Sequence, residues 1–272
     1  MEKLKTGIAW LILIFFAIIT IYPFIYMILG GLMSFQETTI IPPTLVPKHF
    51  NWSNYTQVFK QAPFAQYFIN TLIVATTTTV VSLFTSLLGA FALVNLKFKG
   101  KKTIEVLLLS LLMVPGEAII FTNYNTIAQM GLLNTYLGLV LPFLTSIFYM
   151  YYLRSYFGSI SDTIYKASMI DGASDWNYIW RILVPMSKGG LFTVGLLSFI
   201  SGWNSFLWPL LVTNEDSMRL LNNGLTAFAS DAGSQTQLQL AAATLTVLPI
   251  LIIYFIFRKQ IIRGVVRNDL KG

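Results

Sequence analysis

Residues 7–32 read GIAWLILIFFAIITIYPFIYMILGGL, a run of 26 residues without a charged side chain. An α-helix of about 20 apolar residues crosses the roughly 30 Å hydrocarbon core of a bilayer, because its backbone polar groups are hydrogen-bonded within the helix. The run is too long for a secretory signal peptide and lacks a clear small-residue cleavage site. We therefore predict a retained transmembrane helix.

Five further stretches of the chain meet the same requirement. The six predicted spans are Gly7 to Leu32, Phe68 to Leu96, Val106 to Ala128, Tyr136 to Leu153, Gly190 to Val212 and Gln239 to Phe257. The sequence is 55% hydrophobic and 11% charged, whereas soluble proteins carry about a quarter charged residues. We predict an all-α integral membrane protein in which residues 1–272 form a single transmembrane domain.

The net charge of +7 indicates membrane orientation and not nucleic-acid binding, because the cations are scattered between the apolar runs. Cytoplasmic loops of membrane proteins carry an excess of Lys and Arg. Three of the 18 cations, Lys48, Lys60 and Arg219, fall on one side. The other 15 fall in the two termini and in the second and fourth connections: Lys3, Lys5, Lys97, Lys99, Lys101, Lys102, Arg154, Lys166, Arg181, Lys188, Arg258, Lys259, Arg263, Arg267 and Lys271. This distribution predicts that both termini are cytoplasmic.

Metal and redox chemistry have few candidate residues. The chain has no cysteine and one histidine, His49. These counts exclude a cysteine-type metal site and leave almost nothing for a histidine cluster. We predict no catalytic residue, no metal site and no cofactor bound by this chain.

The fourth connection, Arg154 to Gly189, is far longer than two neighbouring helices need. Ser161 or Asp162 can cap a short helix, which Gly172 can end in the left-handed conformation. A second helix is expected to start near Ser174 and Asp175 and to end at Pro185. Its apolar stripe is Trp176, Ile179, Trp180 and Leu183. The two helices predict a compact cytoplasmic projection, and the alternative is a helix lying flat on the membrane.

This connection contains Lys166-Ala167-Ser168-x-x-x-Gly172, then nine residues, then Ile182-x-Val184-Pro185. The pattern resembles the E-A-A-x-x-x-G-x9-I-x-L-P loop of the inner-membrane permease subunits of ATP-binding-cassette importers. Lys166 stands at the family's glutamate position, which puts any ion pair of that glutamate in doubt. Ser168 and Val184 are milder departures.

The resemblance implies a type I importer permease, multi-pass in the bacterial cytoplasmic membrane, whose loop is a coupling helix that docks on a separate ATPase. The implied ATPase-coupling residues are Tyr165, Lys166, Ala167, Ser168, Met169, Ile170, Asp171, Gly172 and Ala173. The chain itself has no G-x-x-x-x-G-K-[ST] phosphate loop. ATP and Mg²⁺ are therefore expected on the partner ATPase, and this chain is not expected to be an enzyme.

Further segments from about residue 43 to the end resemble the maltose-type carbohydrate permeases. They are Pro43-x-Leu45-x-Pro47, Phe50-x-Trp52-x-Asn54-Tyr55, Asn70-Thr71-Leu72, Val114-Pro115-Gly116-Glu117, Gly131-Leu132-Leu133-Asn134-Thr135, Trp203-Asn204-x-Phe206-x-Trp208-Pro209-Leu210, and the tail from Arg263-Gly264 to Lys271-Gly272. The resemblance implies import of a sugar or oligosaccharide. The implied partners are a second six-span permease, a heterodimer being favoured, two ATPase subunits and an extracytoplasmic solute-binding protein. Membrane lipid surrounds the chain, and no nucleic acid is expected.

Polar side chains in the fifth span are candidates for the solute path. Ser198, Ser201 and Ser205 lie at i, i+3 and i+7, with Trp203 and Asn204 beside them. Hydroxyl and amide groups next to an aromatic ring suit a sugar. The alternative is close helix packing through small residues and hydrogen bonds between helices.

Three other functions remain open. A permease of the same superfamily for a non-sugar solute is the nearest alternative. An ion-coupled secondary transporter usually shows acidic or histidine residues at membrane depth, and Glu117 is the one charged residue within the spans. A membrane enzyme fits less well, because no cluster with nucleophile or metal spacing lies near a membrane face.

Overall fold

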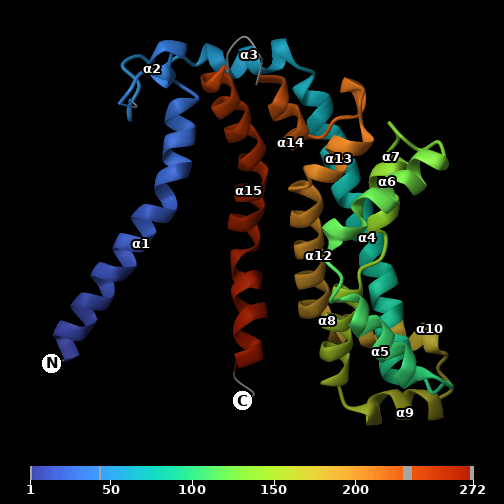
Figure 1. The fold of residues 1–272 in the computed structure, drawn as a ribbon. Coiled ribbons are helices and arrows are strands. Elements are labelled where there is room, and N and C mark those ends of the chain that lie inside the picture. The colour runs from blue at the N-terminus through green and yellow to red at the C-terminus, as the bar shows by residue number, and fades with distance from the viewer. Residues whose placement is uncertain (1, 43, 229–234, 270–272) are drawn as a thin grey trace. The chain divides into compact units, whose positions relative to one another are not determined.

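The chain is built of helices joined by turns and short loops (Figure 1). The computed structural model describes the backbone of residues 2–42, 44–228 and 235–269, and side chains between residues 6 and 259 within these ranges. Pro43, Lys271 and Gly272 lie outside the described residues, as do the side chains of Lys3, Lys5, Arg263 and Arg267. The α-helices are α1 Glu2–Gly30, α2 Phe35–Thr39, α3 Ser53–Gln61, α4 Phe64–Asn95, α5 Lys101–Leu111, α6 Ile120–Gln129, α7 Tyr136–Val140, α8 Ile147–Gly158, α9 Asp162–Ile170, α10 Asp175–Tyr178, α11 Val184–Met186, α12 Lys188–Trp203, α13 Leu207–Val212, α14 Leu221–Gly224 and α15 Thr236–Asp269.

Up to six membrane spans are present among the described residues, by length and apolar composition. Three are single helices: Thr6–Gly30, Phe64–Asn95 and Thr236–Lys259. Three more are bent pairs: Lys101–Leu111 with Gly116–Gln129 at 91°, Tyr136–Phe143 with Ile147–Gly158 at 45°, and Asp175–Met186 with Lys188–Trp203 at 84°. The predicted all-helical membrane fold is confirmed.

Three of the predicted spans are interrupted, the fourth span between Phe143 and Ile147, and the apolar pattern does not reveal these breaks. In the third, α5 ends at Leu111 and a 3₁₀ turn, Gly116–Ile119, begins after Pro115. Proline lacks an N–H and disfavours helical geometry at the preceding residue, so it breaks the helix there. In the fifth, α12 ends at Trp203 and α13 begins only at Leu207.

The chain forms two compact units, of which the first contains Met1–Phe68 and Leu220–Ile253. Within it, the buried Asn54 amide donates to the carbonyls of Gly31 and Met33 at 3.0 and 2.8 Å, and so satisfies acceptors just beyond the end of α1. A Cβ at Gly31 would lie 3.0 Å from the backbone of Ala241 in α15. Glycine at this position therefore permits the close approach of the two helices.

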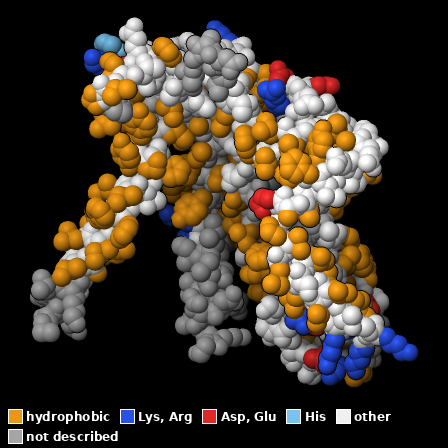
Figure 2. Space-filling view, viewed as in Figure 1, with side chains coloured by type: hydrophobic (Ala, Val, Ile, Leu, Met, Phe, Trp, Pro, Cys, Tyr) orange, Lys and Arg blue, Asp and Glu red, His pale blue; other side chains and the backbone are white. Residues whose placement is uncertain are grey.

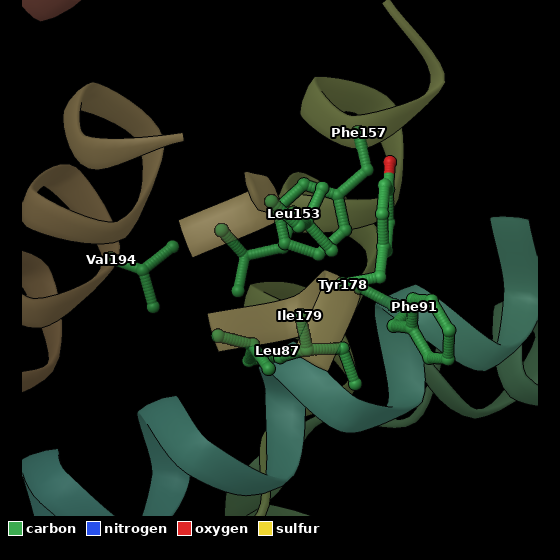
Figure 3. Packing of buried hydrophobic residues seen from close by; sticks show 9 residues of the cluster. Leu87, Phe91, Leu153, Phe157, Tyr178, Ile179 and Val194 are labelled. Carbon is green, nitrogen blue, oxygen red and sulfur yellow. The ribbon is translucent and has the colours of Figure 1, made fainter. Parts of the chain in front are cut away.

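The second unit contains Ile69–Arg219 and Tyr254–Gly272. Its main hydrophobic cluster, called here the core cluster, joins α4, α8, α12 and the segment from α10 through the π-helical turn η3, Ile179–Leu183 (Figure 3). The members of the core cluster are Leu87, Ala90, Phe91, Leu153, Phe157, Tyr178, Ile179, Leu183 and Val194. Each large apolar side chain buried in this way contributes about 1.5–3 kcal/mol. The fourth connection is thus attached to three membrane helices by apolar packing.

Leu153 is fully buried in the core cluster, so we predict that Leu153→Ala lowers the free energy of unfolding by about 2–5 kcal/mol, through lost burial and a residual cavity. The purified chain in detergent should show a lower midpoint of thermal unfolding. Leu107→Ala, at a side chain 59% exposed on α5, is the matched control and should change the midpoint little. Equal effects of the two substitutions would contradict the assignment of the core.

Candidate coupling site and polar pocket

Helix α9 and the turn after it present an exposed outer face. Gly172 has φ +80° and would meet no atom within 4 Å of an added Cβ, which confirms the predicted left-handed end of the helix in open surroundings. Ile170 is 86% exposed, an unusual state for an isoleucine outside a lipid-facing helix. Of the nine predicted coupling residues, five are exposed: Lys166, Ala167, Ile170, Asp171 and Gly172. This face is open to a protein partner.

The inner face of α9 is fixed to the second unit by aromatic packing. The Tyr165 ring meets Tyr178 edge-to-face at 4.9 Å between centroids and Phe91 at 6.0 Å. Met169 packs against the core cluster, and the buried Ser168 hydroxyl donates to the carbonyl of Tyr165 at 2.7 Å. The predicted coupling residues therefore divide into an exposed outer face and a packed inner face. Ala173 is half-buried at the turn between them.

A hydrogen bond joins the two helices of the fourth connection. The Tyr165 hydroxyl donates to Oδ1 of Asp175, at the start of α10, at 2.7 Å. Burial, followed by the hydrogen bond to Asp175, raises the pKa of Tyr165 to about 12. The phenol therefore stays protonated, and remains a donor, at neutral pH.

The predicted caps of both helices occur. Ser161 precedes α9 and its hydroxyl accepts from the amide of Thr163, and Ser174 precedes α10 and accepts from the amide of Asn177. Lys166 forms an ion pair with Asp162 one turn earlier on the exposed surface of α9. The lysine at the family's glutamate position thus has a partner within its own helix.

The predicted apolar stripe of the second helix is divided in the structure. Ile179 and Leu183 are buried, whereas Trp176 and Trp180 are 54% and 41% exposed and pack edge-to-face at 5.6 Å. The reason is the π-helical turn Ile179–Leu183, whose i→i+5 hydrogen bonds change the angular spacing that an α-helical stripe assumes. The two tryptophans are therefore available to lipid or protein.

A separate polar pocket of about 210 Å³ lies among α4, α8 and α12 of the second unit. Three of the predicted solute-path residues line it: Ser198, Ser201 and Ser205. Its remaining hydroxyl-bearing residues are Thr78, Ser82, Thr145, Ser146 and Tyr149. Their common property is an uncharged hydroxyl, the group that best complements a sugar hydroxyl.

Two polar groups in the pocket stand out. Ser82 is buried and its hydroxyl has no hydrogen-bond partner among the described residues, so it has free capacity for a ligand or water. The Tyr149 phenol interacts with the hydroxyls of Ser198 and Ser201. No sequence signal indicated Tyr149, because its partners come from another helix.

Three other residues singled out by sequence lie away from the pocket. The Trp203 side chain is 2% exposed and stacks on Phe199 at 5.8 Å, and Asn204 is exposed beyond the lining. Glu117 lies exposed in the 3₁₀ turn after the break in the third span, and its side chain has no hydrogen bond to another described residue. Across the described ranges, no group of three or more His, Asp and Glu residues could hold a metal ion.

Comparison with known proteins identifies the family of the chain. Residues 85–267 match the family described as Binding-protein-dependent transport system inner membrane component. The chain belongs to this family. The matched region contains the whole fourth connection and most of the polar pocket.

Relatives resemble this permease over almost their whole lengths. The sn-glycerol-3-phosphate transport system permease protein UgpE of Yersinia pestis is 29% identical, with 95% of each chain covered. The diacetylchitobiose uptake system permease protein NgcG of Streptomyces coelicolor is also 29% identical, with 96% of this chain and 87% of that protein covered. A crystal structure of a bacterial ABC transporter involved in the import of the acidic polysaccharide alginate contains a chain of the same fold, with a TM-score of 0.84, 24% identity and coverage of 95% and 96%.

The Tyr165–Asp175 hydrogen bond should couple α9 to α10 energetically. We predict that Tyr165→Phe lowers the free energy of local opening by about 1 kcal/mol, the usual value for such a bond. Hydrogen exchange of the α9 amides measures this opening. In a double-mutant cycle with Asp175→Ala, a coupling energy of about 1 kcal/mol is expected, and strictly additive effects would show that the bond contributes nothing.

Proposed function

We propose that this permease is the membrane subunit of an ATP-driven importer of a sugar or oligosaccharide. It forms the solute path with a second, non-identical six-span permease and receives its solute from an extracytoplasmic binding protein. Two separate ATPase subunits bind ATP and Mg²⁺. The observation that carries the proposal is the two-sided α9, exposed on one face and fixed to the membrane helices on the other.

The outer face of α9 is suited to docking in a groove of the ATPase. Ala167 and Gly172 are small and exposed, so a partner backbone can approach closely, and Ile170 offers an apolar anchor of the kind found at the centre of protein interfaces. The ion pair with Asp162 holds Lys166 along the helix. In this arrangement the lysine replaces the family's glutamate without altering the shape of the docking face.

The inner face of α9 couples the motion of the ATPase to the membrane helices. A displacement of α9 by the ATPase is transmitted through Tyr165, Tyr178 and the core cluster to α4, α8 and α12, because close-packed side chains move together. The same three helices line the polar pocket. Docking and solute access are thus linked through shared helices, and rigid-body motion alternates the access.

The chemistry of the pocket favours a neutral, polyhydroxylated solute. No lysine, arginine, aspartate or glutamate is among its lining residues in the described part of the chain. A phosphate ester is usually bound by Arg, Lys or a helix N-terminus, so the relative's glycerol phosphate is the less suitable model for the solute. At about 210 Å³ the pocket is smaller than typical ligand sites of roughly 300–1,000 Å³. The second permease is expected to supply the remaining wall.

The 15-to-3 distribution of Lys and Arg supports an orientation with both termini and α9 in the cytoplasm, where ATP is available. An ion-coupled secondary transporter has little support, because no acidic residue lines the pocket among the described residues. In this proposal the chain converts motion of the ATPase subunits into a change of solute access, and the ATPase subunits catalyse the hydrolysis of ATP.

Gly172→Trp should uncouple transport, because a bulky side chain at a left-handed position both strains the turn and obstructs docking. We predict at least a tenfold loss of solute uptake in the reconstituted importer, with the permease still in the membrane and ATP hydrolysis no longer stimulated by binding protein. Gly100→Trp is the matched control, since Gly100 also has positive φ and open surroundings. If the Gly172 variant retained full solute uptake coupled to ATP hydrolysis, α9 would not be the docking element.

A second substitution tests the solute path. Ser201→Leu places a larger apolar side chain in the pocket, and we predict a loss of uptake of about tenfold or more while stimulation of ATP hydrolysis by binding protein persists. Ser110→Leu, on an exposed face of α5, serves as the control. Unchanged uptake by the Ser201 variant would show that the pocket is not on the path.

A further inference from the structure

A second cavity of about 370 Å³ lies within the second unit where α4 ends, α5 begins and α8 passes both. Its charged lining residues are Lys101, Lys102, Glu105 and Arg154, which give a net charge of +2. Its other walls are mainly apolar side chains of α4. The volume lies in the range of ordinary ligand sites. The cavity shares no lining residue with the polar pocket proposed for solute.

The arginine of this cavity is held in a fixed orientation. Glu105 accepts hydrogen bonds from Nε and Nη2 of Arg154 at 3.1 and 2.8 Å, and the Tyr151 hydroxyl donates to the carbonyl of Glu105 at 2.6 Å. The Arg154 guanidinium also lies 5.8 Å from the centre of the Tyr151 ring. These contacts leave the Nη1 side of the guanidinium, for which no hydrogen bond is found among the described residues, to meet an anion.

The two lysines play different parts. The Lys101 ammonium donates to the carbonyls of Val94 and Leu96 at 3.3 and 3.2 Å, so it caps the end of α4 and keeps a third proton for a ligand. Lys102 is exposed, and its ammonium has no hydrogen bond or ion pair within the part of the chain that the structure describes. Figure 2 shows Lys and Arg side chains gathered at this end of the second unit.

The surroundings indicate which anion fits. Directly after the lysines, α5 exposes a run of large apolar side chains, among them Val106 at 62% and Leu107 at 59%. Basic residues followed at once by an exposed apolar helix match an anionic headgroup followed by acyl chains. A phospholipid would place its headgroup beside the cations and its acyl chains along this apolar face, whereas a soluble phosphate would use the cations alone.

The geometry points to this cavity as a binding site for the phosphate headgroup of an anionic phospholipid, whose acyl chains lie along α5. The inference depends on the chain being in a membrane and not on the identity of the solute or on coupling to an ATPase. Its test measures the lipid that the chain retains, and this quantity is independent of solute uptake.

The test uses the full chain in nanodiscs of phosphatidylcholine containing a minor fraction of phosphatidylglycerol, with retained lipid counted by native mass spectrometry after transfer to detergent. Each basic residue near an anionic lipid contributes about a fivefold gain in affinity, so Lys101→Gln with Lys102→Gln should weaken retention of phosphatidylglycerol roughly 25-fold. Lys102→Gln alone should weaken it about fivefold and leaves the cap on α4 intact. Lys97→Gln with Lys99→Gln is the control of equal charge outside the lining and should change retention by less than about threefold.

Two results would overturn the inference. If the cavity variants and the control variant lost retention of phosphatidylglycerol equally, the lipid would be attracted to the charged surface in general and not to a site. If inorganic phosphate bound the chain in pure phosphatidylcholine nanodiscs with the same lysine dependence and also displaced phosphatidylglycerol, the cavity would be a site for free anions. Selective, lysine-dependent retention of the lipid that excess inorganic phosphate does not displace would support the assignment.

Discussion

The packing of Tyr178, Ile179 and Leu183 against α4 and α8 is the contact on which the proposed function depends (Figure 3). A loop of this length without an apolar anchor would move independently of the membrane helices. Here the segment from α10 through η3 is built into the core cluster, and α9 is joined to it by the Tyr165 ring and the Tyr165–Asp175 hydrogen bond. The exposed face of α9 is consequently an extension of the helix bundle of the second unit.

This attachment places the two proposed functional surfaces on one set of helices. α4, α8 and α12 carry the core cluster and also line the hydroxyl-rich pocket, so a change in their packing alters both. Such coupling through contiguous packing needs no charged relay, which agrees with the uncharged lining of the pocket in the described residues. Charged residues of this unit lie instead outside the pocket, among them those beside α5 and on α9.

Local signals in the sequence predicted local structure well. The caps at Ser161 and Ser174 and the left-handed Gly172 were predictable because each depends on a side chain or a missing Cβ at one position. The six apolar stretches likewise predicted the helical membrane fold, because a helix is the one way for a single segment to satisfy its backbone in lipid.

Features that depend on several helices were not predictable from the sequence. The π-helical turn divides the expected stripe, so that Trp176 faces outward and Ile179 inward, and no periodicity of 3.6 residues reveals it. Three serines of the pocket were found from their spacing on one helix, whereas Tyr149 was missed because its role arises from α8 lying beside α12. Trp203 was expected beside the solute and is instead buried and stacked on Phe199.

The central claim is that α9 moves as one body with the membrane helices of its unit. The chain has no cysteine, so spin labels can be placed at Thr163→Cys on α9, outside the proposed coupling residues, and Phe84→Cys on α4, both exposed. Pulsed electron paramagnetic resonance on the assembled importer, with and without ATP, measures the distance between the two labels. A narrow distribution that is the same in both states is the predicted result. A distance that shifts or broadens with ATP would show that α9 moves independently of α4 and would contradict the account.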